Sequence, residues 1–333
     1  MKKITLIEGD GIGPEITKAV VNIFEAAKVP ITWEYENAGQ TTLEEKGELI
    51  PDSLIASVKK NQVALKGPIT TPVGKGFKSV NVQLRQMFDL YQNVRPCCST
   101  PGIQSRFENV NLVLFRENTE GLYSGLELYD ERLQMADSIA RVTKKGCINI
   151  IRGAFKYARA HDHKRITLVH KANILKSIGK IFLDAGQEVA QDYPEITMDD
   201  RIIDNMCMQL VMRPEQYDIL VATNLFGDIL SDLCAGLVGG LGVVAGANIG
   251  DEVAIFEAVH GSAPDIAGKG LANPTALLRS ALMMLNHLEM RDHAKKIEDA
   301  LNATFLQKDA LTADLGGKGN TDSFAQAVIN NMK

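Results

Sequence analysis

The chain has 333 residues, a formal net charge of −5 at pH 7, 45% hydrophobic residues and 23% charged residues. This length suits about two domains with a sizeable core, and the composition is that of an ordinary globular protein. The negative charge and the short basic clusters argue against a nucleic-acid-binding protein. No apolar stretch approaches the roughly 18 residues of a membrane span.

Short apolar runs alternate with amphipathic segments along the chain. Strands are predicted at 4–7, 31–35, 63–65, 112–115, 166–169 and 219–222. Helices are predicted at 14–27, 51–60, 145–160 and 174–191. This alternation is typical of an α/β fold with a mainly parallel sheet covered by helices. Runs of turn residues predict loops long enough to carry function at 68–76, 101–111, 239–250 and 261–270.

The cysteines and the first residues of the chain both bear on its compartment. The five cysteines form no C-x-x-C pair, which indicates reduced thiols. The first residues run directly into a predicted strand and leave no room for a signal or transit segment. We therefore expect a cytoplasmic protein.

A glycine-rich stretch, Gly9-Asp-Gly-Ile-Gly-Pro-Glu15, follows the first predicted strand and opens a helix. Glu34 and Glu36 follow about 20 residues later, as in dinucleotide-binding βαβ units. The third glycine of that fingerprint would stand at position 14, which is proline. We therefore interpret the stretch as a structural turn, and a nucleotide has to be sought elsewhere.

The most informative segment is 217–232, in which an apolar run leads into a predicted helix that carries Asp228 and Asp232. Positions four apart lie one turn apart on the same helical face. Two carboxylates at that spacing repel each other unless a hard divalent cation lies between them. No Lys or Arg stands between Arg213 and Lys269, so no cation close in the sequence can pair with them. An exposed acidic stripe is the alternative that the spacing leaves open.

Three arginines, Arg85, Arg95 and Arg116, fall in one region of the sequence. Guanidinium groups bind carboxylates bidentately, so three of them indicate a substrate with more than one carboxylate. Arg116 ends a predicted apolar strand, which is a poor place for a merely solvated charge, whereas Arg85 alone could be a surface residue. Lys171 follows another predicted buried strand, where an acid–base role becomes possible.

With these motifs the sequence resembles the β-decarboxylating dehydrogenases, the family of isocitrate, homoisocitrate and 3-isopropylmalate dehydrogenases. The resemblance covers essentially the whole chain. The matching runs are Gly9-Asp-Gly-Ile-Gly-Pro-Glu15, Lys66-Gly-Pro-Ile-Thr-Thr71, Asn93-Val-Arg-Pro96, Arg116-Glu-Asn-Thr-Glu-Gly121, His170-Lys-Ala-Asn173, Asn224-Leu-Phe-Gly-Asp-Ile-Leu-Ser-Asp232 and His260-Gly-Ser-Ala-Pro-Asp-Ile-Ala-Gly268. It implies a two-domain, non-Rossmann α/β fold. The large domain would comprise 1–97 and 240–333, on the cofactor side, with the mainly parallel sheet. The small domain, 98–239, would carry substrate and metal residues and the dimer interface.

The resemblance also implies a role for each candidate site residue. The substrate would be bound by Ser79, Asn81, Arg85, Arg95 and Arg116. Mg²⁺ or Mn²⁺ would be held by Asp228 and Asp232 with Asp204 of the other subunit. Lys171, which also comes from the other protomer, would assist deprotonation of the C2 hydroxyl, and Tyr123 would protonate the carbon that loses carbon dioxide. NAD would be bound by Thr71, His260, Gly261, Ala263, Asp265, Ile266, Asn273 and Asp314.

The choice of NAD rests on three positions. NADP-dependent bacterial relatives carry lysine, tyrosine and arginine where this chain has Asp265, Ile266 and Gly317. A carboxylate accepts hydrogen bonds from ribose hydroxyls but repels the 2′-phosphate of NADP. A cap on a helix that begins at Ile266 is the alternative role for Asp265.

Ser79 and Asn81 decide among the family's substrates. Both can hydrogen-bond a carboxylate, whereas isopropylmalate enzymes present apolar residues here and homoisocitrate enzymes lack the pair. An apolar substituent would leave the two groups unpaired at about 1–3 kcal/mol each. The sequence therefore predicts oxidative decarboxylation of isocitrate to 2-oxoglutarate, a step of the tricarboxylic acid cycle, in a homodimer with shared active sites. Homoisocitrate dehydrogenase is the alternative, and a regulatory subunit is disfavoured because the catalytic and metal residues are all present.

Overall fold

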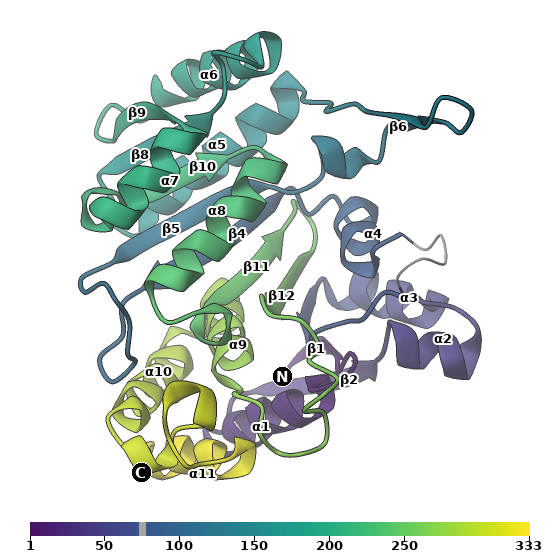
Figure 1. The fold of residues 1–333 in the computed structure, drawn as a ribbon. Coiled ribbons are helices and arrows are strands. Elements are labelled where there is room, and N and C mark those ends of the chain that lie inside the picture. Colours follow the sequence, from purple (N-terminus) through teal and green to yellow (C-terminus); the bar gives the residue numbers. More distant parts are fainter. Residues whose placement is uncertain (73–77) are drawn as a thin grey trace.

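The computed structural model describes residues 1–72 and 78–333, so that Phe77 and part of the predicted loop 68–76 lie outside the described residues. The strands of the main sheet are β1 Lys2–Ile7, β2 Ile31–Glu36, β3 Val63–Lys66, β4 Gln92–Cys98, β5 Asn111–Glu117, β8 Arg165–His170, β9 Thr197–Ile202, β10 Ile219–Ala222, β11 Ala245–Ile249 and β12 Ala254–Ala258. They form one 10-stranded sheet in the order β2-β1-β3-β12-β11-β4-β5-β10-β8-β9 (Figure 1). A separate hairpin, β6 Glu127–Asp130 with β7 Met135–Ser138, extends away from the body.

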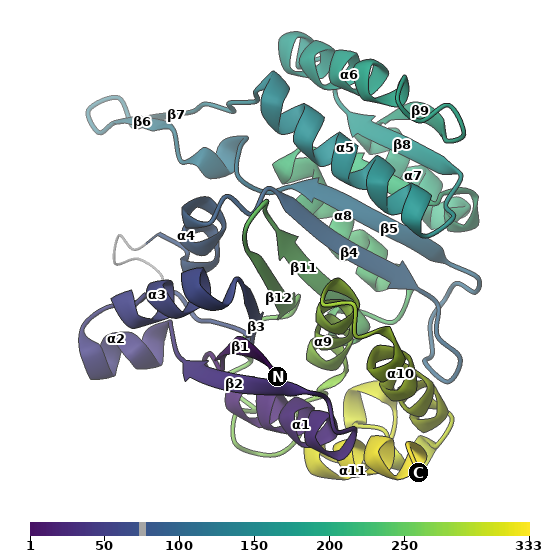
Figure 2. The ribbon, with the colours of Figure 1, turned by 180° about the vertical axis from the view of Figure 1, so that it is seen from behind.

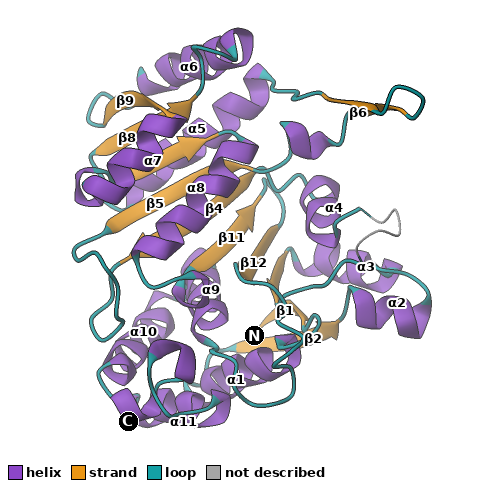
Figure 3. Ribbon diagram, in the orientation of Figure 1, coloured by secondary structure: helices purple, strands orange, loops and turns teal. Residues whose placement is uncertain are grey.

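The sheet changes character at its centre. The four strands β2-β1-β3-β12 at one end of the sheet pair in parallel, and so do the four strands β5-β10-β8-β9 at the other end. Between these blocks, β12, β11, β4 and β5 pair antiparallel. Figure 3 shows the strands continuing from one half of the molecule into the other. The α/β prediction is confirmed, but the sheet is shared by both halves of the chain instead of belonging to the large domain alone. The domain division at 98 and 239 stays a prediction.

Helices cover both faces of this sheet. Their bounds are α1 Gly13–Ala26, α2 Gln40–Lys46, α3 Asp52–Asn61, α4 Val80–Met87, α5 Lys144–Ala160, α6 Lys176–Ala190, α7 Ile203–Met212, α8 Asn224–Leu237, α9 Thr275–His287, α10 Arg291–Phe305 and α11 Thr321–Asn331. On one face α8 packs against β5 and β4 (Figure 1), and on the other α5 packs against β5 and β10 (Figure 2). The inner strands are therefore buried on both sides, as parallel strands require, whereas the edge strands β2 and β9 are partly exposed. In the described part of the chain no helix is long and apolar enough to cross a membrane.

The sequence prediction missed the three central strands β4, β11 and β12, and β11 shows why. The predicted loop 239–250 contains β11, which pairs with β12 and β4. Its sequence, Ala-Gly-Ala-Asn-Ile, is poor in the β-branched and aromatic residues that mark strands. Burial between two neighbours and α9 holds this segment extended, and tertiary contact overrides its weak propensity.

The glycine-rich turn is structural, as predicted. Pro14 lies at the start of α1. The two acidic residues that a Rossmann interpretation would place on a ribose are occupied elsewhere: Glu34 accepts from Asn61, and Glu36 accepts from Ser53, both on α3. Neither carboxylate points to a nucleotide site beside the turn.

Candidate active site

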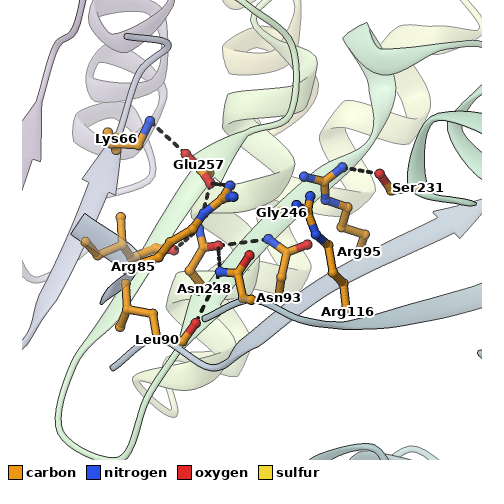
Figure 4. A network of polar contacts seen from close by, with 12 residues as sticks. Lys66, Arg85, Leu90, Asn93, Arg95, Arg116, Ser231, Gly246, Asn248 and Glu257 are labelled. Carbon is orange, nitrogen blue, oxygen red and sulfur yellow. Dashed lines mark hydrogen bonds and ion pairs between the residues drawn. The ribbon is translucent and has the colours of Figure 1, made fainter. Parts of the chain in front are cut away.

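Two of the predicted arginines lie side by side on the central strands. Arg95 on β4 and Arg116 on β5 are both buried. In the β4–β5 register Arg116 is opposite Asn93, two residues from Arg95, so both side chains project from the same face of the sheet. Figure 4 shows Arg95 and Arg116 next to each other. Burial, with Arg116 and Arg85 nearby, lowers the pKa of Arg95 to about 10. Concentrated positive charge of this kind fits an anionic ligand.

Arg116 joins the sheet to helix α8. Its Nε and Nη2 donate to Oδ1 of Asn224 at 3.0 and 2.7 Å, and its Nη1 donates to Asp228. Gly227 makes this approach possible, because a Cβ at that position would lie 2.6 Å from Cγ of Arg116. The residues Asn224, Gly227 and Asp228 therefore fit around one buried guanidinium.

Tyr123, in the short 3₁₀ helix Leu122–Ser124, completes this group. Its hydroxyl donates to Oδ2 of Asp228 at 2.6 Å, and the Arg116 guanidinium lies 4.9 Å from its ring centroid. Burial and the bond to Asp228 raise the pKa of Tyr123. Burial alone would raise the pKa of Asp228, but Arg116 and Tyr123 lower it. Tyr123 thus holds its proton against a carboxylate that stays ionised.

Asp228 and Asp232 lie on one face of α8, as the spacing predicts, but they are not without cationic partners. Arg116 pairs with Asp228, and Nη1 of Arg95 lies 3.9 Å from Asp232. The expectation that no cation was available considered only neighbours along the sequence. The partners come instead from strands more than a hundred residues earlier, which the fold brings beneath α8.

The aspartate pair offers carboxylate ligands to a divalent metal. The side chains of Asp228 and Asp232 remain 40% and 67% exposed, so both present carboxylate oxygens to an incoming ion. Hard oxygen ligands of this kind fit Mg²⁺ or Mn²⁺. In residues 1–72 and 78–333 no three acidic, histidine or cysteine side chains gather as a complete ligand set. The pair fits such an ion as a partial site that needs a further ligand.

Lys171 and Asp204 form a pair of their own. Nζ of Lys171 donates to Oδ1 of Asp204 at 2.8 Å, and this bond lowers the pKa of Asp204. Lys171 follows β8 and Asp204 lies in the first turn of α7. No hydrogen bond or ion pair links them to the Arg116 and Asp228 group among the described residues. Within one chain the predicted catalytic lysine is therefore paired with the predicted third metal ligand and not with Asp228.

The two predicted specificity residues lie at the start of α4. Ser79 is the exposed residue before the helix, and Asn81 lies in its first turn with a buried Oδ1. The backbone N–H of Val80 donates to Oγ1 of Thr71 at 3.0 Å, which ties this helix to the predicted cofactor residue. The last turn of the same helix carries Arg85. One helix therefore presents Ser79, Asn81 and Arg85 together.

A buried carboxylate that sequence reasoning missed holds Arg85 in place. Glu257 on β12 accepts from Lys66 at 2.7 Å and from Nη2 of Arg85 at 3.0 Å (Figure 4). Asn248 donates to the same carboxylate at 2.7 Å, and itself accepts from Asn93. Burial would raise the pKa of Glu257, but Lys66 and Arg85 together hold it far below its usual range. The signal was a lysine at the end of a buried strand, Lys66, whose partner came from a strand that was not predicted.

The predicted cofactor residues come from separate segments. Thr71 follows β3, and the loop after β12 carries His260, Gly261, Ala263, Asp265 and Ile266. Burial lowers the pKa of His260, whose Nδ1 lies 3.0 Å from the carbonyl oxygen of Gly261. Asn273 donates to Asp314 at 2.9 Å, which joins two of the predicted adenosine contacts. Asp265 is exposed on a series of turns, so no helix begins at Ile266 for it to cap.

The chain is similar along almost its whole length to one known protein family. The family model for isocitrate/isopropylmalate dehydrogenase matches residues 3–328. The chain belongs to this family. It is 50% identical over 333 residues to mitochondrial NAD isocitrate dehydrogenase subunit 2 of Schizosaccharomyces pombe, covering 99% of this chain and 87% of that protein. It is 47% identical over 333 residues to a mitochondrial regulatory subunit of NAD isocitrate dehydrogenase from Dictyostelium discoideum, covering 100% of this chain and 92% of that protein.

A solved member of the family has the same fold. The crystal structure of isocitrate dehydrogenase from Methylococcus capsulatus superposes with a TM-score of 0.96 at 51% identity, covering 100% of this chain and 99% of that one. The predicted family and its non-Rossmann α/β fold are therefore confirmed. The prediction of a cytoplasmic location is wrong, because the relatives from Schizosaccharomyces pombe and Dictyostelium discoideum are both named as mitochondrial proteins. Reduced cysteines do not distinguish among the compartments that keep thiols reduced.

The buried Glu257 gives a test of stability. Glu257→Gln should lower the free energy of unfolding at pH 7 by about 3–5 kcal/mol, because it leaves Lys66 and Arg85 buried without a counter-charge. A carboxyl with a lowered folded-state pKa stabilises above its ordinary value of 4.5 and loses that contribution as the pH falls below it. The difference in free energy of unfolding between wild type and variant should therefore become smaller below pH 4.5. Urea unfolding at several pH values measures it, with the exposed Glu252→Gln as control. Equal stability of the two variants at pH 7 would contradict the account.

Asp228→Asn tests the aspartate pair as a metal site. The substitution removes a ligand charge, so turnover should fall at least about 100-fold and Mg²⁺ affinity should drop with it. The chain should still fold, but its melting temperature should fall because Arg116 loses its buried counter-charge, so the drop in Mg²⁺ affinity carries the test. Asp184→Asn, an exposed aspartate on α6, is the matched control. Substantial activity in the Asp228 variant, or full wild-type activity in excess chelator, would exclude the metal role.

Proposed function

We propose that the chain oxidises and decarboxylates isocitrate with NAD as hydride acceptor and Mg²⁺ or Mn²⁺ as the metal. The observation that carries this proposal is the group formed by Arg116, Tyr123 and Asp228. It joins an anion-binding guanidinium, a protonated phenol and an ionised carboxylate through direct contacts. A metal-assisted decarboxylation needs these three functions at one place.

The side chains divide the reaction among themselves. The arginines bind and orient the substrate carboxylates through their paired N–H donors. Tyr123 keeps a proton on Oη, from which it can be delivered to the carbon that loses carbon dioxide. Lys171, held by Asp204, receives the hydroxyl proton at the site of a second copy of the chain. When bound, a divalent ion on Asp228 and Asp232 withdraws charge from the substrate oxygens.

The substrate assignment rests on α4. Ser79 and Asn81 precede Arg85 on this helix, so the segment offers two neutral hydrogen-bonding side chains beside a guanidinium. This set suits a third carboxylate, which isocitrate carries and isopropylmalate does not. Homoisocitrate carries a third carboxylate as well, so isocitrate is preferred over it because the relatives compared above are isocitrate dehydrogenases.

Replacing both Ser79 and Asn81 with leucine tests this assignment. The change removes the polar partners of the carboxylate. The kcat/KM for isocitrate should therefore fall roughly 100-fold or more, which is a loss of several kcal/mol of transition-state stabilisation. Relative use of isopropylmalate should improve. Gln83→Leu on the same helix controls for the addition of an apolar side chain to α4. An unchanged ranking of the two substrates would sink the assignment.

Cofactor choice is attributed to the loop after β12. Asp265 is exposed there and Ile266 follows it, so a 2′-phosphate would meet a negative charge without a cation from these positions. The preference for NAD over NADP should be at least about 100-fold in kcat/KM, or about 2.7 kcal/mol. Asp265→Lys with Ile266→Tyr should shift it toward NADP, and steady-state rates with both cofactors measure the change. Equal or better use of NADP by the wild type would overturn the claim.

A homodimer with shared sites is part of the proposal. Among the described residues no hydrogen bond or ion pair joins the Lys171–Asp204 pair to Asp228, which supports it. Apolar side chains exposed on α7, α8 and the β6–β7 hairpin supply a surface for a second copy: Met208, Val211, Met212, Leu225, Ile229, Leu128 and Tyr129. Of these elements α7 and α8 pack against each other, and exposed apolar side chains gathered on neighbouring helices mark an interface. Relatives named as subunits, including a regulatory one, make a hetero-oligomer the competing assembly.

Complementation tests the shared site. Lys171→Met and Tyr123→Phe should each be nearly inactive, because each lacks one proton-transfer group. When the two are mixed, unfolded and refolded together, part of the activity should return, since one of the two sites in a mixed dimer has both native groups. Mixed dimers are verified by native mass spectrometry. Their formation without recovered activity would count against Lys171 acting across subunits, and a persistent monomer would contradict the homodimer.

A further inference from the structure

The turn between β1 and α1 contacts two of the segments that carry predicted cofactor residues: the first cofactor segment, 68–71, which includes Thr71, and the second cofactor segment, the loop 260–270 after β12. Figures 1 and 2 show the loop after β12 running beside α1. We propose that the glycine-rich turn 9–15 positions both cofactor segments, with Asp10 and Glu15 as positioning residues that act through the backbone of these segments. The inference rests on the proposed function, because it takes these segments to hold NAD.

Asp10 anchors the first cofactor segment. Its side chain is buried, and Oδ2 accepts from the backbone N–H of Thr70 at 2.8 Å. Thr70 is the residue before Thr71, whose hydroxyl in turn receives the N–H of Val80 at the start of α4. The backbone N–H of Asp10 also donates to Pro68 at 2.8 Å. A single buried carboxylate thus fixes the backbone from which Thr71 and helix α4 follow.

The other bonds of Asp10 attach the turn to the body. Its Oδ1 accepts from the N–H of Thr41 at 2.9 Å and from the Thr41 hydroxyl at 2.7 Å. Its Oδ2 also accepts from the N–H of Gln40 at 3.1 Å. These donors lie at the start of α2, where the first backbone N–H groups have no partner within the helix. The Asp10 carboxylate accepts hydrogen bonds from them. Both oxygens of Asp10 are therefore used in holding elements together.

Ile12 and Glu15 anchor the second cofactor segment at its two ends. The N–H of Ile12 donates to the carbonyl of Ser262 at 2.8 Å. The N–H of Gly270 donates to Oε2 of Glu15 at 3.1 Å. Asp265 and the turns around it lie between these anchors. The hydroxyls of Thr70 and Ser262 are 2.6 Å apart, so the two cofactor segments are also bonded to each other.

The glycines of the turn are explained by these contacts. Gly9 has φ 78° and Gly11 has φ 59°, in the left-handed region. A Cβ on Gly9 would lie 2.1 Å from the carbonyl oxygen of Pro68, and one on Gly11 would lie 2.0 Å from that of Ser262. Each glycine therefore meets one of the two cofactor segments. The motif has the first two glycines of a dinucleotide-binding loop, but Gly9 and Gly11 make room for protein backbone.

Variants of Glu15 and Asp10 separate positioning from folding. Glu15→Ala removes the anchor at Gly270, and Glu15→Gln keeps an oxygen that can accept the same bond. Asp10→Asn replaces one accepting oxygen with an N–H₂ group that cannot bond its N–H donors. Glu36→Gln is the matched control. A Rossmann site would need the Glu36 carboxylate to bind a ribose, whereas here that carboxylate accepts a hydrogen bond from the Ser53 hydroxyl.

The readouts are the Kd of NAD by titration calorimetry and the KM and kcat of each variant. Glu15→Ala should raise the Kd and KM of NAD about 3- to 10-fold, and Asp10→Asn by at least as much. The kcat at saturating NAD should stay within about twofold for Glu15→Ala, and so should the KM of isocitrate. Glu15→Gln and Glu36→Gln should behave as wild type. A purely structural role would lower the melting temperature of Glu15→Ala and leave NAD binding unchanged.

Unchanged NAD affinity in folded Glu15→Ala would overturn the proposal, whether or not Asp10→Asn folds. Loss of NAD affinity in Glu36→Gln would overturn it in favour of a Rossmann-like site. Failure of the wild type to bind NAD would contradict the proposed cofactor and this inference with it. Normal wild-type turnover with unaffected variants would contradict the inference alone.

Discussion

The contact on which the site depends is the ion pair between Arg116 at the end of β5 and Asp228 on α8. Arg116 is 1% exposed, and a guanidinium buried to that extent requires a partner. Asp228 supplies the charge, Asn224 accepts two further N–H groups, and Gly227 leaves room for the side chain. This single requirement fixes the height and rotation of α8 over the sheet. The exposed carboxylates of the helix consequently face the same opening as the arginines.

A second buried ion pair sets the other wall of the site. Glu257 holds Lys66 and Arg85 from the strand beside β11, and Asn248 bridges it to Asn93 on β4. These side chains cross the antiparallel centre of the sheet, where the two parallel blocks meet. The buried polar groups of the chain therefore hold the arginines at a defined separation. Rigid placement of this kind is what binding of several carboxylates at once requires.

Local patterns in the sequence predicted the parts of the site that lie on single elements. The spacing of Asp228 and Asp232 placed both on one face of α8, and the end of an apolar run placed Arg116 at the end of β5. The partners could not be predicted, because they depend on which distant strands become neighbours. Glu257 is the clearest case, since it lies on a fully buried strand with no alternation to mark it. Knowledge of the family supplied roles for residues, but the contacts that hold those residues came only from the folded chain.

The most direct test of the account is the initial rate of NADH or NADPH formation by the purified wild-type chain. Isocitrate, homoisocitrate and isopropylmalate are each supplied with NAD and with NADP, in Mg²⁺ and in excess chelator, and the organic product is identified. We expect isocitrate with NAD and Mg²⁺ to give the highest kcat/KM, with 2-oxoglutarate as product and no turnover in chelator. Turnover of another substrate in preference to isocitrate, or metal-independent oxidation, would contradict the central claim.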